Sequence, residues 1–164
     1  AKPNATMQTA NTADTGAMRL WNLTYKDPRR WAEVHAISGK PLGFWTSLKS
    51  GGTGSPRAEL LGGSGELNAL VGVDAALTAC NFERTEKGAI LYFRSRLEVY
   101  GAPFQKGDIS GVTRMPEGAV ERLTMWCGWT GPDGTASSGS VDMRLSRSTA
   151  ERMESYIRRW LAAE

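Results

Sequence analysis

Tyrosine and arginine residues alternate along one extended run of the chain, and a further arginine lies on the strand predicted to pair with it. The five residues are Arg84, Tyr92, Arg94, Arg96 and Tyr100. Because side chains of a strand alternate between its two faces, the four residues of the run are expected to share one face, with the fifth nearby. Rings that stack on bases and guanidinium groups that bind phosphates are typical of surfaces that bind single-stranded nucleic acid. Two other interpretations stay open: Tyr and Arg are also preferred at protein interfaces, and nearby glutamates favour a solvated face with cross-strand ion pairs.

Two cysteines and a single histidine are the other residues that could carry chemistry. Cys80 and Cys127 both fall in predicted strands, where buried thiols are expected, and a disulfide between them is the alternative if those strands lie close together. His35 falls near the end of a predicted helix and is expected to be a hydrogen-bonded structural residue. Because these residues come from separate elements without a short-range pair of ligands, we predict no metal site and no cofactor.

Two glycine-rich stretches, at residues 51–54 and 62–65, raise the question of a phosphate-binding loop. Neither is followed by the Gly-Lys-Ser/Thr sequence or by the capped helix that would bind a phosphate, so both are predicted to be plain loops. The sequence carries no other catalytic motif. We therefore predict that the protein is not an enzyme.

A β-hairpin over residues 75–100 is predicted to position the tyrosine and arginine residues. Its two extended runs are separated by Glu86-Lys87-Gly88, a turn sequence in which Gly88 is expected in the left-handed conformation. The second run is expected to continue unbroken to residue 100. Four of its apolar side chains are expected to face the core: Leu91, Phe93, Leu97 and Val99.

Two helices are predicted beside the strands. The first has Asp27 as its N-cap and Pro28 as its first residue, and Gly39 ends it. The second, near the end of the chain, has Ser148 and Glu151 in the spacing of a capping box. Its apolar stripe is expected to lie on the inner face of the sheet and consists of Met153, Tyr156, Ile157, Trp160 and Leu161.

Further strands are predicted at residues 18–25, 42–48, 67–73 and 119–130, followed by a returning strand that carries Val141, Met143 and Leu145 inward. Residues 49–66 and 101–118 are predicted to be irregular because they are rich in glycine, proline and other turn residues. This order predicts an α+β fold with a mostly antiparallel sheet, a short N-terminal helix and a C-terminal amphipathic helix. A β-sandwich or barrel with peripheral helices is the alternative.

The 164 residues are predicted to form a polar extended arm, residues 1–17, and a single domain, residues 18–164. Hydrophobic residues make up 40% of the chain and charged residues 23%, which is typical of a folded globular domain. No run of about 18 apolar residues is present, so no membrane span is expected. The arm is too polar to bury itself, and we therefore expect it to lie against the domain or against a neighbouring chain, of which the neighbouring chain is favoured.

Three functions fit these observations. The favoured one is a non-enzymatic structural subunit of a larger assembly, of the virion, tail or secretion-apparatus type. Such a subunit would contact further copies of itself or other subunits through its arm and glycine-rich loops, in a virion or a cytoplasmic assembly. The second is a nucleic-acid-binding module that uses the tyrosine and arginine face, which the net charge of +3 allows without requiring. The third is a secreted or periplasmic binding domain, supported by the cysteine pair and by glycosylation sequences at Asn4 and Asn22.

Overall fold

The computed structural model describes residues 18–49, 52–71, 77–130 and 134–162. Within these ranges the chain forms one sheet of eight strands and four α-helices. The arm predicted over residues 1–17 and the turn residues 131–133 lie outside the described residues.

All neighbouring strands are antiparallel, and their order across the sheet is β1-β5-β4-β3-β2-β8-β7-β6. The strands are β1 Trp21–Asn22, β2 Ala58–Gly63, β3 Ala79–Arg84, β4 Gly88–Ser95, β5 Glu98–Gln105, β6 Ile109–Glu117, β7 Val120–Thr130 and β8 Ala136–Ser146. The helices are α2 Pro28–Ser38, α3 Phe44–Lys49, α4 Gly65–Leu70 and α5 Arg147–Ala162, with a short 3-10 turn η1 at Lys106–Asp108. The predicted α+β fold with a mostly antiparallel sheet is confirmed. Because the strands form one open sheet, the alternative of a sandwich or barrel is wrong.

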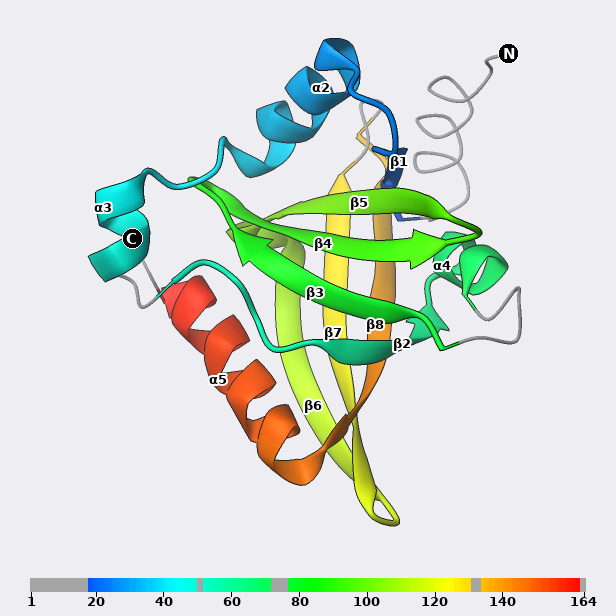
Figure 1. Cartoon of the computed structure of the whole chain (residues 1–164). Helices are drawn as coiled ribbons and strands as arrows, with labels where there is room; N and C mark the ends of the chain where they lie inside the picture. Colours follow the sequence, from blue (N-terminus) through cyan, green and yellow to red (C-terminus); the bar gives the residue numbers. More distant parts are fainter. Residues whose placement is uncertain (1–17, 50–51, 72–76, 131–133, 163–164) are drawn as a thin grey trace.

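The sheet is strongly curved, so that β5, β4, β3 and β2 cross in front of β8, β7 and β6 (Figure 1). The main core fills the inside of this curve, and α5 closes it by packing against β6, β7 and β8. Side chains from five elements meet there with at most 1% of their surface exposed: Phe82, Leu91, Met125, Met143 and Trp160. The predicted burial of Val141, Met143 and Leu145 on β8 is confirmed.

The C-terminal helix α5 is present as predicted, although it begins slightly earlier. Ser146 precedes the first helical residue, and its Oγ accepts a hydrogen bond from the Thr149 backbone N–H at 3.4 Å. Ser146 therefore takes the position expected for Ser148, and the predicted cap is wrong by two residues. The buried stripe of this helix consists of Ala150, Met153, Tyr156, Ile157 and Trp160, with Leu161 partly buried.

An ion-pair network joins α5 to the sheet. Arg114 of β6 donates to Glu121 of β7 at 2.7 Å and to Glu154 of α5 at 3.0 Å. Glu154 also accepts from Arg158 at 2.9 Å, and Glu121 lies 3.3 Å from the Arg147 guanidinium. Hydrogen bonds from Arg114 lower the pKa of both glutamates below the ordinary value of 4.5. Both carboxylates are therefore charged at neutral pH and hold β6, β7 and α5 together.

Helix α2 begins and ends as predicted. The Asp27 side chain accepts a hydrogen bond from the Arg29 backbone N–H at 3.0 Å, and Pro28 is the first helical residue. Gly39 ends the helix with φ +78°, a conformation that side chains disfavour. On the opposite side of the sheet from the main core, α2 forms a second, smaller core whose buried members are Trp21, Leu23, Val34 and Ile90.

The predicted hairpin is present as β3 and β4, but two of its details are wrong. Gly88 has no left-handed conformation; it is needed because a Cβ at this position would lie 1.8 Å from the carbonyl oxygen of Phe104 on β5. The second run ends at Ser95, and Arg96 and Leu97, with φ of 52° and 68°, form a turn into β5. Leu97, expected in the core, is consequently 89% exposed.

Five other segments differ from their predictions. Residues 42–48 contain most of the helix α3, residues 67–73 contain most of α4, and the two segments predicted to be irregular contain β2, most of β5 and β6. Of the strand predicted at 18–25, only Trp21–Asn22 pairs. The strand preference of an aromatic residue reflects how well its side chain fits a half-buried pleated surface. Because α3 has no buried residue, the strand preference of Phe44 and Trp45 does not decide the structure of this segment.

Proline occurs in two of the three strands that fall in the segments predicted to be irregular, β5 and β6. Pro103 lies in β5, beyond the two residues, Tyr100 and Gly101, that β1 covers. Pro116 lies in β6, the last strand of the sheet. Because proline cannot donate a backbone hydrogen bond, it is tolerated where a strand has no further neighbour. The turn-like composition of these strands therefore reflects the place of β6 at one edge of the sheet and of β5 beside the two-residue strand β1.

In the described part of the chain, no helix is both long enough and apolar enough to cross a bilayer.

Candidate functional site

The structure separates the five residues predicted to form one face. Tyr92 and Arg94 share the outer face, which we define as the side of β3, β4 and β5 turned away from the main core. Arg96 lies in the turn between β4 and β5. Arg84 pairs with Ala89, a member of the main core, and therefore lies on the inner side.

Tyr100 also lies on the inner side, because the two-residue turn changes the alternation of faces. Across the β4–β5 pair, Tyr100 lies opposite Phe93 and Val99 lies opposite Arg94. The rings of Tyr100 and Phe93 are stacked, with centroids 5.6 Å apart and planes at 15°. Val99, predicted to face the core, is on the outer face instead. The expectation that Tyr92, Arg94, Arg96 and Tyr100 share one face is therefore wrong.

Tyr92 and Arg94 line a shallow groove, which we call the outer-face groove. It has a volume of about 290 Å³. The register explains its composition: Asn81 of β3 lies opposite Tyr92, and Val99 of β5 lies opposite Arg94. The complete lining is Arg57, Leu77, Ala79, Asn81, Tyr92, Phe93, Arg94 and Val99. Tyr92 and Arg94 were predicted as site residues, whereas Arg57, Leu77 and Asn81 were not, because they come from segments that meet only in the folded sheet.

The polar groups of the outer-face groove are mainly donors. Burial, and secondarily the charge of Glu83, raises the pKa of Tyr92 to about 12, so its hydroxyl stays protonated at neutral pH. Among the described residues, no carboxylate within 4.0 Å pairs with Arg57 or Arg94. Two guanidinium groups, a phenol and an amide therefore line one groove, together with the apolar side chains of Leu77 and Val99.

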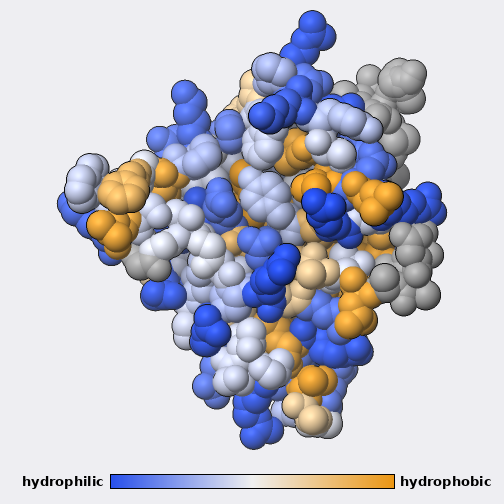
Figure 2. All heavy atoms as spheres, viewed as in Figure 1, coloured by the Kyte–Doolittle hydropathy of each residue, from blue (hydrophilic) through white to orange (hydrophobic). Residues whose placement is uncertain are grey.

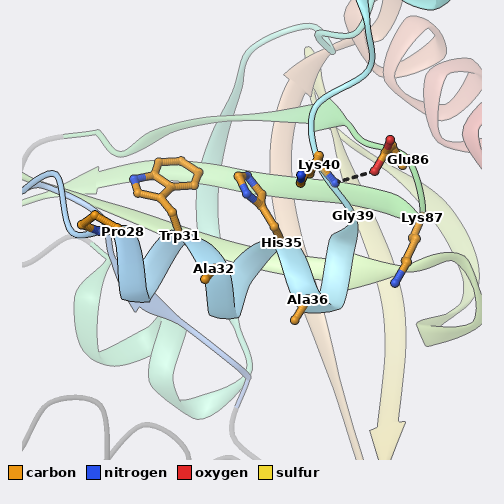
Figure 3. A pocket seen from close by; sticks show the side chains of 9 residues that line it. All are labelled: Pro28, Trp31, Ala32, His35, Ala36, Gly39, Lys40, Glu86 and Lys87. Atoms are coloured by element: carbon orange, nitrogen blue, oxygen red, sulfur yellow. Dashed lines mark hydrogen bonds between the residues drawn. The ribbon is translucent and has the colours of Figure 1, made fainter.

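A second groove runs along α2 and contains the single histidine (Figure 3). Its volume is about 530 Å³. The rings of Trp31 and His35 lie side by side on the same side of α2, with centroids 5.4 Å apart. The Lys40 backbone N–H donates to the Glu86 carboxylate at 3.0 Å and closes one end. His35 Nε2 is buried and finds no hydrogen-bond partner within the described ranges, so the predicted hydrogen bonding of this histidine is not seen at that atom.

The short helix α3 carries a third feature, the α3 apolar surface, which consists of Phe44, Trp45 and Leu48. These side chains are 72%, 72% and 61% exposed, and no residue of the helix is buried. The rings of Phe44 and Trp45 meet edge to face, with centroids 5.1 Å apart. Figure 2 shows apolar side chains gathered over α3 at the left edge of the view. This surface was not predicted, because the aromatic composition of residues 42–48 indicated a strand.

The two cysteines are separate buried thiols, Cys80 on β3 and Cys127 on β7. Burial raises the pKa of each thiol to about 12, so neither is a reactive thiolate at neutral pH. No group of three or more His, Cys, Asp or Glu residues in the described ranges could hold a metal ion.

The two predicted glycosylation sequences begin at Asn4 and Asn22. The side-chain amide of Asn22 donates a hydrogen bond to the Glu98 carboxylate at 2.6 Å. Asn4 lies outside the described residues.

Comparison of the chain with protein-family models, with curated proteins and with solved structures gives no match.

Proposed function

We propose that the protein is a non-enzymatic subunit of a larger assembly and that it contacts a neighbouring subunit through the α3 apolar surface. The observation that supports this proposal is the exposure of Phe44, Trp45 and Leu48 at 72%, 72% and 61%. Contiguous exposed apolar side chains usually mark an interaction site, because leaving them in water forfeits the hydrophobic free energy of covering them. A neighbouring subunit would cover them.

The size of the surface indicates what it can contribute. With about 150–250 Å² for each large side chain, the exposed parts of the three residues amount to roughly 400 Å². A specific interface buries about 800 Å² on each partner, so α3 supplies about half of one. Tryptophan is enriched among the few residues that carry most of the binding energy of an interface. We therefore assign Trp45 the central contact, with the rest of the interface around it.

Charge around α3 indicates the kind of neighbour. Lys40 and Lys49 flank the apolar residues, and residues 40–49 contain no Asp or Glu. A short helix that presents apolar residues at positions i, i+1 and i+4 is suited to lie in a groove of another protein. The neighbour proposed is therefore a protein with an apolar groove and an acidic rim.

The test is the mass of the native particle. A variant with Phe44, Trp45 and Leu48 all changed to Ser is compared with the wild type in cells that naturally make the protein, by size exclusion with light scattering and chemical cross-linking. The matched control is Leu97→Ser, which removes an apolar side chain that is 89% exposed in a turn. The wild type and the control should elute well above the 17.8 kDa of one chain, and the triple variant should elute as that single chain.

Two results would reject the proposal. One is a wild type that elutes as a single chain, and the other is a triple variant that stays in the larger particle. If the triple mutation abolished only sedimentation with lipid vesicles, α3 would be a membrane-docking element and the assembly role would be refuted.

A further inference from the structure

The outer-face groove is separate from α3 and has a chemistry that the assembly role does not use. Its lining combines two cationic side chains, two neutral donors and exposed apolar surface, as described above. Each property restricts the ligand that would fit.

The positions of the polar groups follow from the strand register. Arg57 precedes Ala58, which pairs with Cys80, so Arg57 extends the row that Asn81 and Tyr92 form across β3 and β4. Arg94 lies two residues further along β4 on the same face. With strands about 4.8 Å apart and about 3.3 Å per residue, the Cα atoms of Arg57 and Arg94 are roughly 12 Å apart. Two long arginine side chains at that separation can converge on one anion from opposite sides.

Two carboxylates on this face bear on the charge of the groove. Glu83 lies two residues from Asn81 on the same face, and its charge contributes to the raised pKa of Tyr92, but it forms no ion pair within 4.0 Å with Arg57 or Arg94 among the described residues. Glu59, on the neighbouring β2, lies 3.5 Å from the Arg144 guanidinium. The positive charge of Arg57 and Arg94 is therefore available to a ligand, and guanidinium groups bind carboxylates and phosphates through paired hydrogen bonds.

The apolar residues indicate that the ligand is more than a bare anion. Leu77 is 79% exposed and lines the groove beside Val99 and Ala79. A ligand with an apolar body would cover these side chains while its charged group lies between the arginines. The volume of about 290 Å³ is close to the lower end of the range for ligand sites, roughly 300 Å³, so the body is the size of one ring or a short branched chain.

The surroundings of the two tyrosines argue against a strand of nucleic acid. Tyr92 packs against Trp31, with ring centroids 6.5 Å apart, and Tyr100 stacks on Phe93 on the inner side. Successive bases need a series of open aromatic faces, and this face offers one ring that is already partly covered.

We propose that the outer-face groove binds a small organic anion, a carboxylate or phosphate ester with an apolar body, through Arg57, Arg94, Asn81 and the Tyr92 hydroxyl. The carboxylate and the phosphate ester share the chemistry that these donors recognise.

The experiment measures binding of benzoate, phenyl phosphate, inorganic phosphate and a thymidine oligonucleotide by NMR chemical-shift titration of the folded protein. Benzoate or phenyl phosphate should bind with a dissociation constant near the millimolar range, as expected for about ten non-hydrogen atoms, and should shift the signals of Asn81 and Tyr92. Inorganic phosphate should bind at least tenfold more weakly because it lacks the apolar body. The stronger of the two aromatic probes identifies the anionic group.

Arg57→Gln and Arg94→Gln should each weaken binding about tenfold or more, whereas Arg96→Gln should leave it unchanged, because Arg96 is an exposed arginine in the turn outside the groove. The proposal is overturned if neither aromatic anion shifts the groove signals at 20 mM, roughly twenty times the expected millimolar constant. Equal losses in all three variants would also overturn it, and so would saturation by the oligonucleotide alone, which would assign the face to nucleic acid. None of these outcomes depends on the α3 surface.

Discussion

Trp160 provides the most direct test of how the fold is held together, because it connects α5 to the curved sheet. Its side chain is 1% exposed, and its ring centroid lies 6.3 Å from that of Phe82 on β3. We expect Trp160→Ala to remove this contact and to leave a cavity between the helix and the sheet. The chain has another tryptophan, Trp45, with the same side chain at 72% exposure, which makes Trp45→Ala a matched control.

The expected loss can be worked out in two ways. An aromatic side chain of this size buries about 150–250 Å², which at about 25 cal/mol per Å² corresponds to at most about 4–6 kcal/mol. Measured truncations of buried aromatic residues to alanine cost about 3–5 kcal/mol, and we adopt that range for the free energy of unfolding. For a chain of this length each kcal/mol lowers the melting temperature by about 2–4 °C, so Tm should fall by about 6–20 °C. Trp45→Ala should change the free energy of unfolding by less than about 1 kcal/mol.

The assay is urea unfolding at 25 °C, followed by circular dichroism, with thermal melts as a second measurement. A loss below about 1.5 kcal/mol for Trp160→Ala, or a loss equal to that of Trp45→Ala, would show that α5 does not close the core. If Trp160→Ala fails to fold, Trp160→Phe retains one ring and should still lose about 1–2 kcal/mol.

Two further predictions concern the ion-pair network and a close backbone approach. Because Arg114 lowers the folded-state pKa of Glu121 and Glu154, their contribution to stability is present above the unfolded value near 4.5 and is lost as pH falls through the folded-state values. In thermal melts, Tm of the wild type should therefore fall as the pH is lowered from about 5 to about 3, a range that includes the unfolded pKa. Glu121→Gln should show a smaller fall in Tm over this range. An equal fall in the variant would count against the network. Gly88→Ala should lower the free energy of unfolding by at least about 2 kcal/mol, since its Cβ would meet the Phe104 carbonyl oxygen. Gly111→Ala, with nothing within 4 Å of the new Cβ, is the control, and equal losses in urea unfolding would contradict the stated cause.

The parts of the fold that could be predicted carry strong local signals. Helix α2 is marked at its start by the Asp27 cap and Pro28 and at its end by Gly39, and each of these signals is local. Alternation of apolar residues marks β7 and β8, and helical spacing marks α5. Strand β6 and most of strand β5 could not be predicted, because Gly101, Pro103 and Pro116 suggest turns. Their place in the sheet depends on pairing with other strands, and no local pattern records that.

The candidate site was only partly predictable for a similar reason. Tyr92 and Arg94 are neighbours on one strand, so alternation places them together. The turn at Arg96 and Leu97 uses two non-glycine residues in left-handed conformations, and such residues give no turn signal, so the inward position of Tyr100 could not be foreseen. Arg57 and Asn81 meet Tyr92 only through the alignment of β2, β3 and β4.

The two prolines at the rims of the sheet have a consequence for how copies or partners can join this protein. A strand edge with unpaired backbone N–H and C=O groups can pair with an extended segment of another molecule, which is the first step toward fibrils and strand exchange. Pro103 and Pro116 each delete a donor from such an edge. Addition of a strand from another molecule is therefore hindered along β6 and along the part of β5 that β1 leaves uncovered, which favours association through side chains.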